Sequence, residues 1–265
     1  NMNTFTVYGI ILIYGVLIGS FLNVCIYRIP EGSSIVVGRS HCMNCNTPLK
    51  WYDMVPVISY LILRGRCRKC KAKISIQYPV IEALNGVFYM LTFYIYGWDS
   101  IEDIILSMAS CFVISALIVL SVIDFRTNTI PVGINIFILF VGIITVMLQY
   151  FWFHCGLDVV IEHVIGFFAI SIFLVIIFFA TGGRGIGGGD IRLMAAAGLV
   201  LGWKNIILAF FLGCVLASII HPIRMKIGHV TKVLAFGPYL SAGIVTALLY
   251  GGQIIDMYVR IFFCR

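Results

Sequence analysis

The chain is 265 residues long and has a net charge of +7, with 61% hydrophobic but only 11% charged residues. Soluble globular domains have about twice this share of charged residues, so the composition excludes an ordinary soluble protein. We therefore predict an all-α polytopic membrane protein. The positive charge lies mostly in the predicted loops, so we expect no nucleic-acid partner.

Eight apolar segments reach or approach the ~20 residues that a helix needs to cross a bilayer. The first has no basic leading region and no small-residue cleavage site, so we predict a retained span rather than a removable signal peptide. The predicted spans are approximately 5–27, 78–96, 103–123, 132–152, 160–181, 190–202, 205–221 and 235–251.

Lys and Arg are unevenly distributed between the two faces that eight spans define. One face is formed by the loops 28–77, 124–131, 182–189 and 222–234. These loops, counted together with the adjoining ends of the spans, contain 15 of the 18 basic residues. The other face has only Lys204, Arg260 and Arg265. Because basic loops remain in the cytoplasm, we predict that this face is cytoplasmic and that both termini lie outside.

The first cytoplasmic loop is the only segment with the composition of a soluble domain, and it contains two Cys-x-x-Cys pairs. Cys42 and Cys45 form the first pair, and Cys67 and Cys70 form the second, with 21 residues between the pairs. Four thiolates in this spacing are typical of a closed tetrahedral zinc site, which would stabilise a loop too small to fold alone. The alternative is two disulfides, which a reducing cytoplasm disfavours.

Two aspartates lie where predicted spans end on the cytoplasmic side. Asp124 follows an uninterrupted apolar run, and Asp190 follows Gly187, Gly188 and Gly189. A carboxylate at membrane depth is costly, and two that share a proton can supply the acid and the base of a hydrolysis. The three glycines would let an extended peptide substrate approach closely. The simpler alternatives are a helix end at the water boundary for Asp124 and a helix N-cap for Asp190.

These motifs together resemble the type IV prepilin peptidase family of intramembrane aspartyl proteases. The segment Gly187–Asp190 matches the family's G-x-G-D signature, and the resemblance extends over almost the full chain. The other matching segments are 19–30, the double Cys-x-x-Cys loop, 78–82, 124–131, 187–193 and 236–239. The sequence departs from the family at Arg192, where Lys is usual, and at Val132, where many members have Asp.

The resemblance implies a bifunctional enzyme in the cytoplasmic (inner) membrane of a bacterium. Such an enzyme removes the short basic leader of a prepilin or pseudopilin after Gly on the cytoplasmic face. It then methylates the new N-terminus with S-adenosylmethionine. Asp124 and Asp190 would be catalytic, and Glu82 is a candidate for the methylation site, although it could equally be a first-turn carboxylate that complements the helix dipole.

The predicted domain division follows from these assignments. The first span covers 1–29, the cytoplasmic zinc-binding loop domain covers 30–77, and the membrane-embedded protease core covers 78–265. The basic cluster of the loop, which includes Arg64 and Lys73, is expected to contact anionic membrane lipid.

Two other functions fit parts of the sequence. An ion-coupled secondary transporter could use Asp124 and Asp190 as ion-binding carboxylates, but it would place them near the bilayer midplane and would show repeat symmetry. A zinc-stabilised membrane scaffold would leave the paired aspartates and the glycine run unexplained.

Overall fold

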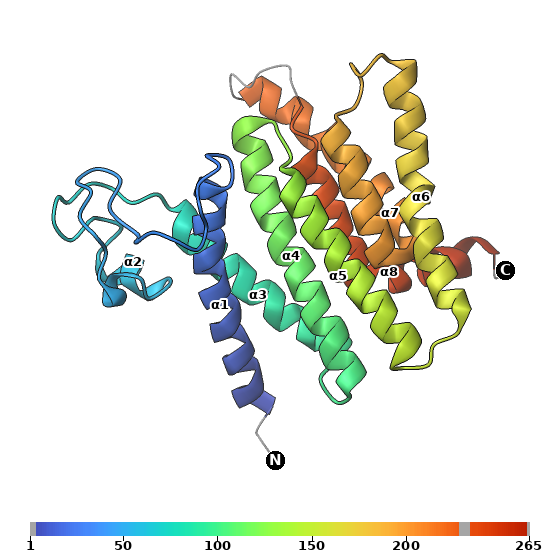
Figure 1. The fold of residues 1–265 in the computed structure, drawn as a ribbon, viewed down its shortest axis with the longest axis horizontal. Helices are drawn as coiled ribbons and strands as arrows, with labels where there is room; N and C mark the ends of the chain where they lie inside the picture. The colour runs from blue at the N-terminus through green and yellow to red at the C-terminus, as the bar shows by residue number, and fades with distance from the viewer. Residues whose placement is uncertain (1–3, 228–233, 264–265) are drawn as a thin grey trace. The chain divides into compact units, whose positions relative to one another are not determined.

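A computed structural model describes residues 4–227 and 234–263. These residues form long helices joined by loops, with no extended strand among them, which confirms the predicted all-α class (Figure 1). The helices are α1 Thr4–Arg28, α2 Ile58–Ile62, α3 Gln77–Tyr96, α4 Ile101–Thr127, α5 Val132–Phe151, α6 Leu157–Ala180, α7 Gly188–Ile227 and α8 Gly237–Phe263. The chain divides into two compact units, unit 1 (residues 1–97) and unit 2 (residues 98–265).

Unit 1 is built on the close packing of α1 against α3. A side chain on Gly15 would collide with Gly86, and one on Gly19 would collide with the Cα atom of Glu82, so the two backbones approach as only glycine permits. Asn85 donates a 2.7 Å hydrogen bond to the carbonyl of Gly15. Small residues and interhelical amide bonds are typical of helix pairs in membranes.

The loop between α1 and α3, residues 29–76, has only short elements of its own. They are the 3-10 helix η1 Trp51–Asp53, helix α2 and two isolated bridges, His41 with Pro48 and Arg66 with Lys73. Arg68 forms a 2.8 Å ion pair with Asp53. With so little regular structure, this loop needs another source of order.

Helix α4 extends four residues beyond the predicted span 103–123. It begins with a capping box, in which Ser100 and Asp103 satisfy each other's backbone N–H groups. It ends at Thr127 because Asn128 adopts a left-handed conformation and its N–H bonds the carbonyl of Asp124. Asp124 therefore lies inside the last turn of a helix rather than in the following loop.

Helix α7 reverses direction at Gly202, whose φ of 75° and ψ of 170° break the helix. Its first turn contains Asp190, which interacts electrostatically with Asp124 of α4. Near its other end, the guanidinium of Arg224 lies 4.7 Å from the ring centre of Phe125, the next residue of α4. Both ends of α7 thus lie at the same end of unit 2, so its two halves correspond to the separate spans predicted at 190–202 and 205–221.

The first half of α7 packs tightly against α6. Gly166 and Gly198 leave no room for a side chain on either helix. The ring of His163 lies 2.7 Å from the carbonyl of Leu199, which the break at Gly202 leaves without its usual helical partner. Helix α7 also contacts α5 and α8, so it is the element around which unit 2 is arranged.

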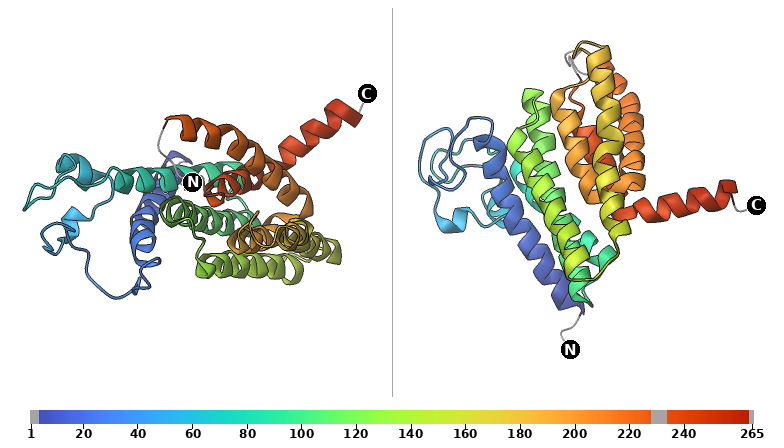
Figure 2. Two further views of the ribbon diagram at one scale, coloured as in Figure 1. Left: turned by 90° about the horizontal axis from the view of Figure 1, so that it is seen from above. Right: turned by 45° about the vertical axis from the view of Figure 1, so that its right-hand side comes forward.

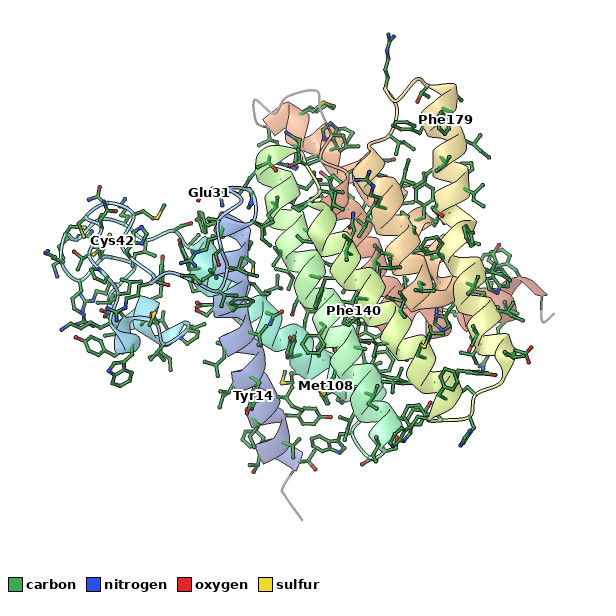
Figure 3. The ribbon with its side chains drawn as sticks, viewed as in Figure 1. Tyr14, Glu31, Cys42, Met108, Phe140 and Phe179 are labelled. Atoms are coloured by element: carbon green, nitrogen blue, oxygen red, sulfur yellow. The ribbon has the colours of Figure 1, made fainter. Side chains whose placement is uncertain are left out.

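Six of the described helices are long and apolar enough to cross a membrane, namely α1, α4, α5, α6, α7 and α8. Large apolar side chains such as Phe140 and Phe179 are exposed on their outer surfaces, as lipid contact requires (Figure 3). The protein is therefore a multi-pass membrane protein. Helix α3 coincides with the predicted span 78–96 but does not meet the same criterion, so its crossing stays a prediction.

The C-terminal side of unit 2 differs from the expected boundaries. Helix α8 continues twelve residues beyond the predicted end at 251, because no Pro interrupts residues 252–263. Its last turns lead away from the other helices of the unit (Figure 2). In the predicted loop 222–234, residues 222–227 are helical and 228–233 lie outside the described residues.

Candidate active site and metal centre

Asp124 lies buried in the last turn of α4, with 4% of its surface exposed. Its Oδ2 accepts a 2.9 Å hydrogen bond from the N–H of Gly237, the first residue of α8. The first N–H groups of a helix have no partner inside the helix, so this one is available to a carboxylate. A side chain at residue 237 would begin 2.8 Å from that oxygen and 3.1 Å from Leu120, so only glycine fits.

Asp190 lies in the first turn of α7 with 9% of its surface exposed. Its carboxyl group is close enough to that of Asp124 for a direct electrostatic interaction. The structure therefore brings together the two aspartates that the sequence singled out, from helices far apart in the chain. Two carboxyls that share a proton can supply the acid and the base of a hydrolysis, so this pair is a candidate catalytic site.

The three glycines before Asp190 differ in their surroundings. A side chain on Gly189 would meet Ile130 at 2.8 Å, and one on Gly187 would approach the Asp190 carboxyl at 3.2 Å. A side chain on Gly188 would meet no described atom within 4 Å. Packing against Ile130 thus explains why residue 189 is glycine. The predicted access for a substrate remains untested, and Gly188 is the glycine with the most open space for it.

Asn135 on α5 is a polar residue at this site that the sequence interpretation missed. It is 4% exposed, and its Nδ2 donates to the carbonyl of Gly189 at 3.4 Å. Its Oδ1 is buried and has no partner among the described residues. A side-chain amide within an apolar membrane span is costly unless it has a hydrogen-bond partner. The presence of Asn135 in such a span was therefore the sequence feature that could have identified it.

A second cluster at this end of unit 2 contains Arg224, Phe125 and Tyr239. The Arg224 guanidinium covers the Phe125 ring, and its Nη1 lies 3.5 Å from the Tyr239 hydroxyl. The Phe125 and Tyr239 rings meet edge to face with centroids 6.4 Å apart. Tyr239 belongs to the segment 236–239 that carried the resemblance, and this cluster ties α4, α7 and α8 together beside Gly237.

In unit 1 the four cysteines of the loop form a single cluster. Their sulfur atoms all lie within 4.8 Å of one another, and the Sγ atoms of Cys42 and Cys70 are 3.8 Å apart. A tetrahedral site with metal–sulfur bonds of ~2.3 Å requires sulfur–sulfur distances of about 3.8 Å, so the arrangement could hold a metal ion. All four are free thiols, which does not favour the disulfide alternative.

The two cysteine pairs adopt the same backbone turn. Cys42 N–H bonds the carbonyl of Thr47, and Cys67 N–H bonds the carbonyl of Ala72, five residues on in both cases. The residue after each second cysteine, Asn46 or Lys71, has a φ between 50° and 60°. The chain thus builds the cluster from two copies of one knuckle.

Hydrogen bonds within the knuckles favour the thiolate at Cys45 and Cys67, whereas the pKa of Cys42 is raised. The side chain of Thr47 lowers the pKa of the Cys45 thiol to about 6. A backbone hydrogen bond from Cys70 lowers the pKa of Cys67. Because the thiolate is the form that binds a metal, this environment suits a metal centre.

Glu82, the candidate for the methylation site, lies on α3 in unit 1 and is 6% exposed. Its Oε2 accepts a 2.7 Å hydrogen bond from the N–H of Val57 in the loop. It also lines a cavity of about 940 Å³ whose lining residues all belong to unit 1. The structure therefore places Glu82 in a different compact unit from the two aspartates.

Comparisons with known proteins agree with this division into two units. The bacterial peptidase A24 N-terminal domain matches residues 13–96, and the type IV leader peptidase family matches residues 111–221. Several relatives are named prepilin leader peptidase/N-methyltransferase. The relative from Bacillus subtilis (strain 168) is 33% identical over 95% of this chain and 98% of its own. The relative from Pseudomonas putida is 30% identical over 91% of this chain and 90% of its own. The relative from Neisseria gonorrhoeae is 30% identical over 86% of this chain and 85% of its own. No solved structure gives a significant match.

Proposed function

The chain belongs to the type IV leader peptidase family, and we propose that it cleaves the leader from type IV prepilins or pseudopilins after Gly and then methylates the new N-terminus. One observation carries the cleavage half of this proposal. Asp124 and Asp190, from two distant segments, lie buried and interacting at one end of unit 2.

The two carboxyls act on a water molecule without a covalent intermediate. The ionised aspartate takes a proton from the water, and the oxygen of that water attacks the carbonyl carbon of the scissile peptide. The protonated aspartate donates a hydrogen bond to the oxyanion that develops. The carbon–nitrogen bond then breaks, and the aspartate that took the proton from the water gives it to the departing amine, which becomes the new N-terminus. Gly237 holds Asp124 in place throughout, because its N–H bonds the Oδ2 atom.

We propose that the cysteine cluster binds a structural zinc ion. Cys42, Cys45, Cys67 and Cys70 fill all four tetrahedral positions, so no position remains for a substrate. The ion would order the loop of residues 29–76, which has little regular structure of its own. It has no part in peptide hydrolysis.

We further propose the orientation predicted from the basic loops. The protein would lie in the cytoplasmic membrane of a bacterium, with the cysteine loop, Asp124 and Asp190 on the cytoplasmic side. Both chain ends would lie outside, and basic residues of the loop would contact anionic lipid. A prepilin leader, which never crosses the membrane, would then remain on the side where cleavage occurs.

Methylation is assigned to unit 1, where Glu82 is the buried carboxylate. S-adenosylmethionine would supply the methyl group. The alternative of an ion-coupled transporter has no support, because the matching relatives are named as peptidases and the aspartates lie at helix ends rather than at mid-helix.

The test uses the purified full-length protein in detergent with a synthetic prepilin and S-adenosylmethionine. We expect mass spectrometry to detect a mature pilin that has lost its leader and gained one methyl group. The double variant with Asp124→Asn and Asp190→Asn is the control, and it should leave the leader attached. An uncleaved substrate after incubation with the native protein would contradict the proposal.

A further inference from the structure

The cavity of unit 1 has the size of a binding site for a small molecule. Its volume of about 940 Å³ lies within the range of roughly 300–1,000 Å³ that is usual for ligand pockets. The C-terminal turns of α1, the cysteine loop and the N-terminal turns of α3 form its walls. Ser20, Asn23, Tyr27, Tyr78 and Glu82 line the part formed by the two helices.

The loop contacts Glu82 through Val57, a residue with a strained backbone conformation. Val57 has a φ of 59° and a ψ of −52°, and the N–H of Ile58 bonds the carbonyl of Pro56, which is the rare form of the γ-turn. Such a conformation is strained in a β-branched residue. It persists here beside the hydrogen bond from the Val57 N–H to the buried Glu82 carboxylate.

Glu82 is a buried carboxylate that forms no ion pair in the part of the chain that the structure describes. Ser20 lies within hydrogen-bonding range of it, but a hydroxyl brings no positive charge. Arg28, which also lines the cavity, donates instead to the carbonyls of Ser34, Val37 and Gly38. A buried carboxylate without an ion pair is a candidate site for a cation supplied from outside the chain.

The whole cavity has six basic and three acidic residues in its lining, so a cation would be bound locally, at the wall that contains Glu82. Two further features of this wall suit a cationic ligand with a planar group. The rings of Tyr27 and Tyr78 are stacked with centroids 5.7 Å apart, so they offer an aromatic face close to α1 and α3. Aromatic faces attract cations and stack with planar rings. Asn23 is fixed by bonds from its Nδ2 to the carbonyls of Tyr78 and Gly19, which keeps this wall rigid.

We propose that this cavity binds the sulfonium methyl donor beside Glu82, and that the Glu82 carboxylate both pairs with the sulfonium charge and accepts the proton of the substrate amine. This inference rests on the methylation half of the proposed function. The substrate ammonium gives a proton to Glu82, and the freed nitrogen lone pair forms a bond to the methyl carbon. The carbon–sulfur bond breaks, and its electron pair stays on sulfur as a neutral thioether.

The test compares two ligands that differ in charge at sulfur. S-adenosylmethionine has the positive sulfonium, and S-adenosylhomocysteine has the neutral thioether. For the full-length protein with Glu82→Gln, we expect about tenfold weaker binding of the first ligand and less than about threefold weaker binding of the second. Equilibrium dialysis with labelled ligands measures both values.

Two control variants separate this role from a structural one. Asp158→Asn makes the equivalent change at an exposed carboxylate that does not line the cavity and should leave both affinities unchanged. Asp190→Asn should bind both ligands normally while it loses cleavage. If Glu82→Gln weakened both ligands equally, Glu82 would only hold the loop, and the proposal would be wrong.

Failure of the site and failure of the function give different results. If the native protein methylates a mature pilin but Glu82→Gln keeps the native ratio of the two affinities, the site assignment is overturned and methylation stands. If the native protein neither binds the donor nor transfers its methyl group, both the site and the methylation half of the proposed function are overturned. Cleavage by the aspartates would be untouched in either case.

Discussion

Units 1 and 2 each bury carboxylates on helices, but they hold them in different ways. In unit 1 a single carboxylate, Glu82, bonds a strained turn of a loop that four cysteines organise. In unit 2 two carboxylates lie at helix ends that pack closely together, and glycine permits this packing, as where Gly237 contacts Asp124. Chemistry in unit 1 should therefore depend on a metal-ordered loop, and chemistry in unit 2 on the packing of membrane helices. Two activities that depend on different structures should be separable by mutation.

The largest effect is expected from the aspartates. Asp124→Asn or Asp190→Asn should reduce cleavage about 1,000-fold, because the amide keeps the shape but can neither take the proton nor share it. Methyl transfer to a pre-cleaved pilin should remain within about twofold of native. Mass spectrometry with prepilin and with mature pilin as separate substrates measures both activities.

The control for this pair is Asp158→Asn, which changes an exposed carboxylate in the first turn of α6 and should affect neither activity. Equal loss of both activities in Asp124→Asn would mean that the two reactions share one site. The comparison of the two units would then have no functional meaning.

The next largest effect is expected from the cysteine cluster. Elemental analysis should find one zinc ion per chain, and Cys42→Ser or Cys67→Ser should lose it. Methyl transfer should then fall at least about tenfold further than cleavage, since the metal orders the loop rather than the aspartates. Cys155→Ser, which removes a free thiol outside the cluster, should retain zinc and both activities. A zinc-free native protein with oxidised cysteines would contradict both the metal and the cytoplasmic placement.

Hydropathy predicted the positions of most helices well. The spans expected at 78–96 and 132–152 differ from α3 and α5 by one residue at one end, because charged or Gly/Pro-containing segments delimit these apolar runs. The break at Gly202 was also expected from the gap between two predicted spans. The helix ends were less well predicted, since the left-handed Asn128 and the continuation of α8 depend on local conformation that hydropathy does not encode.

The candidate site was predictable only in part. Asp124 and Asp190 stand out because carboxylates are rare in apolar segments, and the cysteine spacing is specific by itself. Asn135 and the N–H of Gly237 could not be found in this way, because their importance depends on which helices pack together. Sequence therefore identified the candidate catalytic and metal-binding groups, and the structure adds residues that contact the two aspartates and their neighbours.

Gly237→Ala tests whether unit 2 depends on helix packing at the site. The added methyl group would lie 2.8 Å from the Asp124 Oδ2, so the carboxylate must shift and the N–H bond must lengthen. We expect a 10- to 100-fold loss of cleavage, about the cost of a small displacement of a reacting group. Gly252→Ala on the same helix meets nothing within 4 Å and should cleave normally. Equal rates for the two variants would show that Gly237 does not position Asp124.

A smaller effect is expected at Asn135, which holds the carbonyl of Gly189 beside Asp190. Asn135→Ala should lower kcat for cleavage about tenfold with little change in KM, because the start of α7 would be less well fixed. Asn205→Ala is a matched control, since Asn205 also has an unpartnered amide oxygen but lies near the Gly202 break. If both variants lost the same activity, the effect at Asn135 would be one of general stability.

The smallest effect is expected from Gly188→Ala. This variant tests whether the glycine run serves substrate access or helix packing. The methyl group of Gly188→Ala meets no described atom within 4 Å, and alanine favours a helix start over glycine, so the thermal unfolding temperature should not fall. A peptide substrate that approaches the backbone at this point would meet the new methyl group. We therefore expect KM for prepilin to rise about two- to fivefold while kcat stays near native. Gly189→Ala, which would collide with Ile130 at 2.8 Å, should lower both kcat and the unfolding temperature. An unchanged KM in Gly188→Ala would show that the substrate does not pass over this residue, and the glycine run would then serve the packing of α7 alone.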